Sequence, residues 1–445
     1  MDNARLVALK ALLKVQYDDG YSNIVLDNIL NKSGLSKKDR SLTTAIFYGV
    51  LERRIELDYI ISLYSKTKLK KLSKDNLEIL RMGVYQIKYM DKIPNSAVIN
   101  ESVKLAKMRR QFKSTGFINA VLRSIDNNLN NIQIPKEKDD ILLHLSIKYS
   151  CPEWLVKHFV DSYNMQNTQK ILQSLSGRPP LIIRVNTLKN TTDELIEILK
   201  FEGINASRTI LENALEINSI DSMSNIKAFR EGRFHVQDLA SQICCDILNP
   251  KEGQTVIDVC AAPGGKTFNI AQRLQNKGTV FSFDLYESKV NLIKDGAKRL
   301  GIEIINAFVR DASSQKDVMP IADRVLCDVP CSGLGIIRRK PEIRYKNKEI
   351  LDSLTSLQYL ILCNSEKFTK ENGILVYSTC TLNPLENTYV ANKFLKEHSN
   401  YEPYEIKLPS GITRGIDEPK NQLTLLPGLN NTDGFFIATF KKRKN

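Results

Sequence analysis

Two cysteines about fifty residues apart each follow a stretch that the sequence indicates is a buried β-strand. Cys331 ends the run Asp328-Val-Pro-Cys331, and Cys380 ends the run Ser378-Thr-Cys380. In an open parallel sheet, ligands bind outside the carboxyl ends of the strands, so we expect both thiols in one crevice. A thiolate is the nucleophilic form of cysteine, and this pattern therefore indicates covalent catalysis by a thiol.

A third apolar strand, Thr255–Val259, leads into a loop with two glycines that opens a helix. Such a loop lets the backbone approach a ligand closely. The sequence matches neither Gly-x-Gly-x-x-Gly nor a Walker A loop, so a nucleotide phosphate is not the expected ligand. The residues predicted to bind a cofactor here are Cys260, Ala261, Ala262, Pro263, Gly264, Gly265 and Lys266.

Three acidic residues follow successive predicted strands. Asp284 ends the strand after the glycine loop, Asp311 follows the next strand, and Asp328 ends the fourth. A carboxylate at the first position commonly accepts hydrogen bonds from ribose hydroxyls, and Asp311 is placed to meet an adenine edge. Any single acid has a plausible role as a helix N-cap, but three in strand order indicate a site for an adenosyl ligand without phosphates.

The chain of 445 residues carries a net charge of +14, which favours a polyanionic partner. Residues 1–140 hold 25 lysines and arginines against 16 acidic residues, a surplus of nine. A lysine-rich genome is the alternative explanation of this excess.

The eight cysteines show no zinc-type spacing, and the chain has only four histidines, so we expect no metal site. The cysteine pattern fits reduced thiols in the cytosol. No apolar run approaches the roughly 18 residues of a membrane span, and the N-terminus does not resemble a signal peptide. We expect a cytoplasmic protein that does not bind membranes.

Hydrophobic periodicity divides the chain into three predicted domains. Residues 1–135 show helical spacing throughout, residues 141–233 form a small α/β piece, and residues 234–445 alternate strand and helix. The alternation predicts a parallel sheet covered by helices on both faces. Its predicted strands are 255–259, 279–284, 304–309, 323–328, 373–378 and 434–441.

These motifs resemble the RsmB/NOP family of S-adenosylmethionine-dependent RNA cytosine-C5 methyltransferases. The chain has the family's Cys-Ala-Ala-Pro-Gly-Gly-Lys, Asp-x-Pro-Cys-Ser-Gly and Ser-Thr-Cys motifs in order. The segments Val98–Lys107 and Gly116–Leu122 are similar to the helical antitermination factor NusB. The resemblance implies an all-α NusB-like N-terminal domain, a small α/β linker subdomain and a Rossmann-like class I methyltransferase core. Within the family, the NusB-like domain implies the bacterial 16S rRNA enzymes, with 16S rRNA as partner. We also expect a monomeric chain.

The resemblance also assigns roles to the two thiols. Cys380 corresponds to the nucleophile, and Cys331 to the group that assists proton removal and release of the enzyme. Carbon 5 of cytosine is a poor nucleophile until a group adds to carbon 6, which explains the need for a thiolate. Asp328 is suited to hold the N3/N4 edge of the base. Lys266 is expected either to steer a phosphate or to support Asp328, although a lysine in the first helical turn is ordinarily a surface residue.

Basic residues directly after Cys331 are predicted to contact RNA phosphates, because they would line the mouth of the crevice. They are Arg338, Arg339, Lys340 and Arg344.

Other functions remain open at this point. A DNA cytosine-C5 methyltransferase carries its nucleophile in the Pro-Cys motif. It would have no need of Thr379-Cys380 and would require a large target-recognition insert, and neither expectation fits this chain. Methylation of another RNA, either tRNA or 23S rRNA, is an alternative. A non-enzymatic NusB-like RNA-binding or antitermination protein would not require the cofactor loop and the two thiols.

Overall fold

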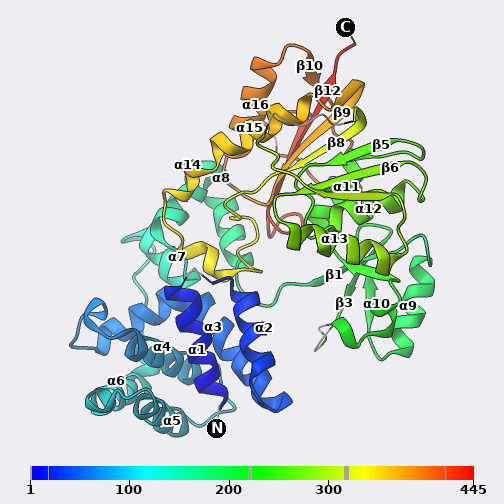
Figure 1. The fold of residues 1–445 in the computed structure, drawn as a ribbon. Coiled ribbons are helices and arrows are strands. Elements are labelled where there is room, and N and C mark those ends of the chain that lie inside the picture. The colour runs from blue at the N-terminus through cyan, green and yellow to red at the C-terminus, as the bar shows by residue number, and fades with distance from the viewer. Residues whose placement is uncertain are drawn as a thin grey trace. The chain divides into compact units, whose positions relative to one another are not determined.

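The computed structural model describes residues 3–18, 20–218, 220, 223–314, 320–415 and 417–444. The chain forms two compact units, and Figure 1 colours the chain by residue number. The first comprises Met1–Gly177 and Ile337–Lys348, and the second comprises Arg178–Ile336 and Glu349–Asn445. The second unit is therefore interrupted in sequence by twelve residues that belong to the first.

The first unit is helical, as the periodicity predicts. The apolar faces of the helices up to residue 128 bury a continuous core to which α1, α3 and α4 contribute most, for example through Leu9, Phe47 and Leu80. Ser36 begins the long helix α3 by accepting a hydrogen bond from the amide of Asp39. The helices are α1 (Ala4–Tyr17), α2 (Ser22–Lys32), α3 (Lys37–Tyr64), α4 (Lys74–Tyr89), α5 (Asn95–Met108), α6 (Thr115–Asn128), α7 (Ile141–Tyr149) and α8 (Glu153–Ser174), with short 3₁₀ turns η1 (Leu69–Lys71), η2 (Phe112–Ser114), η3 (Leu129–Asn131) and η5 (Pro341–Tyr345).

The helices α7 and α8 lie in this first unit, whereas the sequence analysis placed residues 141–175 in the small α/β piece. A polar linker precedes them in sequence, but α7 packs against α3. The composition of the sequence does not show against which domain a helix packs.

The second unit begins with a small antiparallel sheet in the order β2-β3-β1-β4. Thr191 and Glu194 form a capping box that starts the helix α9 on this sheet. The strand β4 extends the sheet beyond the predicted boundary at residue 233. The elements are β1 (Leu181–Val185), α9 (Thr192–Phe201), β2 (Ala206–Arg208), β3 (Ala214–Ile217), η4 (Met223–Asn225), α10 (Lys227–Arg230) and β4 (Phe234–Val236).

The rest of the second unit is a larger sheet in the order β10-β12-β9-β8-β5-β6-β7, with β11 paired to β12. The five strands from β9 to β7 are parallel to one another, and β12 joins β9 antiparallel. The strands are β5 (Thr255–Asp258), β6 (Thr279–Asp284), β7 (Ile305–Val309), β8 (Ala322–Asp328), β9 (Thr369–Thr379), β10 (Tyr401–Pro403), β11 (Gln422–Leu425) and β12 (Phe435–Lys442). The helices are α11 (Leu239–Leu248), α12 (Gly265–Arg273), α13 (Glu287–Leu300), α14 (Ile350–Ser353), α15 (Thr355–Glu366) and α16 (Thr388–Glu397).

Successive residues of the central strands face two different cores. Val256 and Leu326 pack in the core shared with α11, α12 and α13. Ile257 and Val325 pack in the core shared with α15 and α16. Figure 1 shows these two helical layers on opposite sides of the sheet. The continuous apolar runs of the sequence follow from this burial on both faces, and the predicted Rossmann-like architecture is confirmed.

None of the described helices is both long enough and apolar enough to cross a membrane.

Candidate functional site

The two predicted thiols meet at the carboxyl ends of adjacent strands. Because β8 and β9 run parallel with Asp328 opposite Ser378, the residues that follow them are brought together. The sulfur atoms of Cys331 and Cys380 lie 3.2 Å apart. Both cysteines are free thiols and partly exposed. The hydrogen bond to Cys380 and burial raise the pKa of Cys331 well above its ordinary value. A protonated Cys331 can therefore donate its S–H to the Cys380 sulfur.

Asp328 lies beside this pair and is held through both carboxylate oxygens. Lys266 Nζ donates to one oxygen at 2.7 Å, and Ser378 Oγ donates to the other at 2.7 Å. The side chain of Asp328 is still about a quarter exposed. A carboxylate has about four acceptor positions, so Asp328 can accept further hydrogen bonds from a bound base.

The surroundings of Lys266 distinguish its two predicted roles. Its side chain is only 13% exposed, and its ammonium lies 5.1 Å from the centre of the Phe435 ring. Burial has the largest single effect and lowers the pKa of Lys266, but the Asp328 carboxylate together with Cys244 and Cys245 raises it above its ordinary value. Lys266 is thus a permanently charged support of Asp328, not the surface residue that its helical position would ordinarily make it.

The loop between β5 and α12 makes a sharp turn before the helix. Gly264 has a φ of +110°, and a side chain there would clash with the Phe268 ring. Beneath the loop, Asp258 is buried and accepts a hydrogen bond of 2.7 Å from Thr267 Oγ1. Burial raises the pKa of Asp258 to about 7. The turn leaves backbone groups of the loop at the carboxyl edge of the sheet, where a ligand can reach them.

The acidic residues at the ends of β6 and β7 differ in their surroundings. Asp284 is largely buried and accepts weak hydrogen bonds of 3.3 Å from the amides of Ala262 and Tyr286. Asp311 is exposed, and hydrogen bonds from Ser313 lower its pKa. Because β5, β6 and β7 are neighbours, the loop and both acids share one edge of the sheet. This set of oxygen and amide groups fits an adenosyl ligand, with Asp284 next to the loop backbone.

A buried glutamate that the sequence analysis missed ties the two cysteine loops together. Glu386 is fully buried. One of its oxygens accepts hydrogen bonds from the Ser332 amide at 2.9 Å and from Gln358 Nε2 at 2.7 Å. Its other oxygen accepts from Asn383 Nδ2 at 3.0 Å. The side chains of Ser332 and Thr381, which directly follow Cys331 and Cys380, also share a hydrogen bond of 2.7 Å. The polar residues after Cys380, between β9 and α16, are the sequence feature that could have indicated this glutamate.

We expect Glu386→Gln to destabilise the fold by about 2–4 kcal/mol. The substitution replaces one carboxylate oxygen with an NH₂ group, so the buried donors that bond to that oxygen would lose their acceptor. The methyl transfer that the sequence predicts should also fall by about tenfold or more, because this network connects the loops that carry the two thiols. Thermal unfolding and initial rates would measure both effects. The exposed Glu371→Gln is the matched control. A Glu386→Gln protein as stable and active as this control would exclude a positioning role.

The predicted RNA contact at Arg344 is wrong. Arg344 is fully buried in the first unit, and its guanidinium donates to backbone carbonyls of Glu52, Tyr149, Ser150 and Leu175. These bonds anchor the inserted segment to α3, α7 and α8. Its neighbours Arg338, Arg339 and Lys340 are partly exposed. A basic run in sequence therefore contains one structural arginine that charge alone could not identify.

The described residues contain no group of three or more histidine, cysteine, aspartate or glutamate side chains that could hold a metal ion.

Comparison with known proteins identifies three matched regions of the chain. Residues 245–441 match the family model of the 16S rRNA methyltransferase RsmB/F, residues 2–127 match the NusB family, and residues 151–223 match the ferredoxin-like domain of RsmF/B-like methyltransferases. The "Probable ribosomal RNA small subunit methyltransferase B" of Bacillus subtilis is 36% identical over 99% of both chains. The "Ribosomal RNA small subunit methyltransferase B" of Photorhabdus laumondii is 31% identical over 99% of both chains.

Solved structures extend these similarities. The crystal structure of PH0851 is similar over 99% of both chains, with a TM-score of 0.82 and 26% identity. The structure of NSun6 from Pyrococcus horikoshii with SFG, an analogue of S-adenosylmethionine, covers 66% of this chain and 99% of that chain, with a TM-score of 0.60 and 25% identity.

Proposed function

We propose, from the premise that this chain belongs to the RsmB/F family of 16S rRNA methyltransferases, that it methylates carbon 5 of a cytosine in 16S rRNA through a bond between Cys380 and the base. S-adenosylmethionine supplies the electrophilic methyl group. The observation that carries the proposal is the pair of thiols 3.2 Å apart beside a carboxylate held by lysine.

Cys380 attacks carbon 6 of the cytosine as a thiolate, and the new S–C6 bond makes carbon 5 electron-rich. Asp328 accepts a hydrogen bond from the N4 amino group. N3 takes up a proton from solvent as the thiolate attacks, and Asp328 stabilises the positive charge that the N3/N4 edge carries after methyl transfer. The N3 proton returns to solvent when the thiolate leaves. Lys266 donates a hydrogen bond to Asp328 and orients it for this contact with the base. The carboxylate thus favours the adduct over the free base.

Cys331 then assists removal of the proton from carbon 5. Its pKa is raised in part by the hydrogen bond and the charge of Cys380. Once the Cys380 sulfur is bonded to carbon it carries no negative charge, so this contribution to the pKa of Cys331 disappears. Adduct formation therefore lowers the pKa of Cys331, so that its thiol can lose its proton to solvent and, as a thiolate, accept the proton from carbon 5. As the C5 proton leaves, the S–C6 bond breaks and Cys380 departs as a thiolate.

The cofactor would be held by the backbone of Cys260–Gly265 and by Asp284 and Asp311. Asp284→Ala should weaken binding of S-adenosylmethionine by about 1.5–3 kcal/mol, the size of charge-assisted hydrogen bonds to ribose hydroxyls. Calorimetry would measure the dissociation constant, with the exposed Asp295→Ala on α13 as control. An unchanged constant for Asp284→Ala would remove this residue from the site.

The basic first unit would bind the RNA backbone, with Arg338, Arg339 and Lys340 as contacts. Phosphate neutralisation dominates RNA affinity, so Lys340→Gln should lower the slope of log affinity against log salt by up to about one. Binding titrations at several salt concentrations would measure it. An unchanged slope would exclude Lys340 as a phosphate ligand. We also infer a monomer that acts in the cytoplasm, which light scattering and cell fractionation would test.

Incubation with labelled S-adenosylmethionine and unmodified 16S rRNA, 23S rRNA, tRNA or duplex DNA tests the substrate. We expect label at a cytosine of 16S rRNA. Transfer only to tRNA or 23S rRNA would correct the substrate, and no transfer to any RNA would favour a binding protein.

A further inference from the structure

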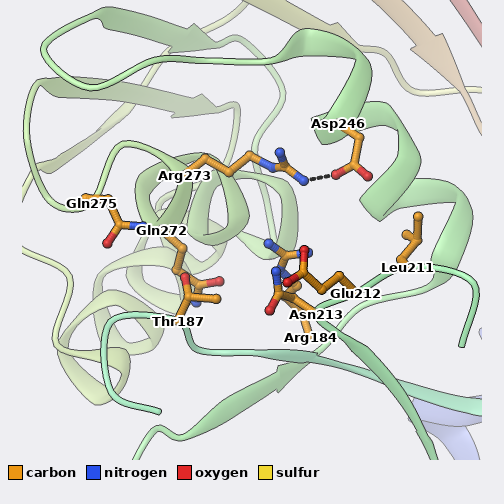
Figure 2. A pocket seen from close by; sticks show the side chains of 9 residues that line it. All are labelled: Arg184, Thr187, Leu211, Glu212, Asn213, Asp246, Gln272, Arg273 and Gln275. Carbon is orange, nitrogen blue, oxygen red and sulfur yellow. Dashed lines mark ion pairs between the residues drawn. The ribbon is translucent and has the colours of Figure 1, made fainter. Parts of the chain in front are cut away.

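A pocket of about 330 Å³ lies in the second unit at the end of α12 remote from the cofactor loop (Figure 2). Its lining comes from β1, from the loop before β3, and from the ends of α11 and α12. The loop precedes the first residue of α12, whereas Gln272 and Arg273 end the helix. Nine helical residues span about 13 Å, so this pocket is separate from the proposed methyl-transfer site.

Arg184 of β1 is the charged group buried in this pocket. It is 4% exposed, and its Nε has no hydrogen-bond partner. No ion pair of Arg184 is found among the residues that the structure describes. Burial, together with the nearby Arg273, lowers the pKa of Arg184 to about 10, so the guanidinium remains charged at neutral pH. A buried charge without a counter-ion is strongly unfavourable, which points to an anion that completes the site.

Gln272 supplies a second set of free polar groups. It is fully buried, and neither its side-chain nitrogen nor its oxygen has a hydrogen-bond partner. Figure 2 shows Arg184, Asn213 and Glu212 among the side chains that line the pocket. Glu212 is exposed, as expected for a residue at the rim.

The remaining charges do not neutralise Arg184. Arg273 forms an ion pair with Asp246, so these two residues offset each other. Glu212 is the other acidic residue of the lining. It raises the pKa of Arg184, but burial, Arg273 and Cys245 each have a larger effect on that pKa. The space holds the volume of about eleven water molecules, enough for a phosphate group with an attached sugar.

We propose that this pocket binds a phosphate group, with Arg184 as its cationic ligand and the Gln272 amide as a hydrogen-bond donor. A guanidinium matches phosphate oxygens in a bidentate arrangement, which a solvent anion such as chloride cannot use. The phosphate can be free inorganic phosphate or part of the RNA backbone. The second source rests on the proposed function, whereas the first does not.

Titration of the full-length protein with inorganic phosphate, against sodium chloride of equal ionic strength, tests the site. We expect calorimetric binding and a raised unfolding temperature with phosphate only. Arg184→Met should weaken phosphate binding at least tenfold. If this variant does not fold, Gln272→Met is the alternative test of the pocket. Lys277→Ala, an exposed cation just beyond α12, is the control and should bind as the parent does. Equal affinity in the parent and the pocket variants would place any bound phosphate elsewhere and overturn the site.

Methylation kinetics separate the two sources. If the RNA backbone occupies the pocket, Arg184→Met raises the KM for RNA with kcat unchanged, and inorganic phosphate competes with RNA. If free phosphate is the ligand, only phosphate binding changes. No phosphate binding together with an unchanged KM would refute the proposal. A parent protein that binds phosphate but methylates no RNA would contradict the proposed function and leave this pocket's assignment intact.

Discussion

Cys380→Ala should abolish methylation, with a loss of more than about a thousandfold, while the affinity for S-adenosylmethionine stays within a few-fold. The thiol forms the bond that activates the base, and no neighbouring group can replace it in that step. The cofactor loop and Asp284 lie at the ends of other strands and do not depend on this sulfur. Single-turnover methylation of 16S rRNA and cofactor calorimetry would measure the two effects.

Cys363→Ala is the matched control, because Cys363 is also a partly exposed thiol but lies on α15. It should retain activity. Turnover by Cys380→Ala at a rate near that of this control would show that the nucleophile is elsewhere, with Cys331 as the first candidate.

Cys331→Ala should stop the reaction after the S–C6 bond has formed. Without Cys331 the C5 proton is removed slowly, so the Cys380 adduct with RNA accumulates. We expect a protein–RNA species that survives denaturing gel electrophoresis, and mass spectrometry should locate the modified peptide at Cys380. The short distance between the sulfurs places Cys331 where it can act on the adduct.

The double variant Cys331→Ala/Cys380→Ala should give no such species. A stable adduct in Cys380→Ala, and none in Cys331→Ala, would reverse the two roles. The chain would then use its Pro-Cys thiol for attack.

The positions of the cofactor loop, Asp284, Asp328 and both thiols could be predicted from the sequence because each directly follows an apolar strand. A parallel sheet brings such strand ends to one edge regardless of the distance between them in sequence. The contact between Lys266 and Asp328 was one of two roles considered for this lysine, and only the structure distinguishes them.

Other features depend on contacts that no local pattern records. Arg344 carries the same charge as its neighbours, but its partners are the carbonyls of residues 52, 149, 150 and 175. Glu386 looks like an ordinary loop glutamate, and its importance comes from donors at Ser332 and Gln358. The proposed phosphate pocket likewise combines Arg184 of the small sheet with Gln272 of α12.

The most direct test of the account is release of tritium from 16S rRNA labelled with [5-³H]cytosine. Methyl transfer to carbon 5 replaces the hydrogen on that carbon, so the account predicts one tritium released to water for each methyl group incorporated at a labelled cytosine. Release should require both S-adenosylmethionine and Cys380. Incorporation of methyl groups from the cofactor without tritium release would contradict the account, because the methyl group would then be on another atom.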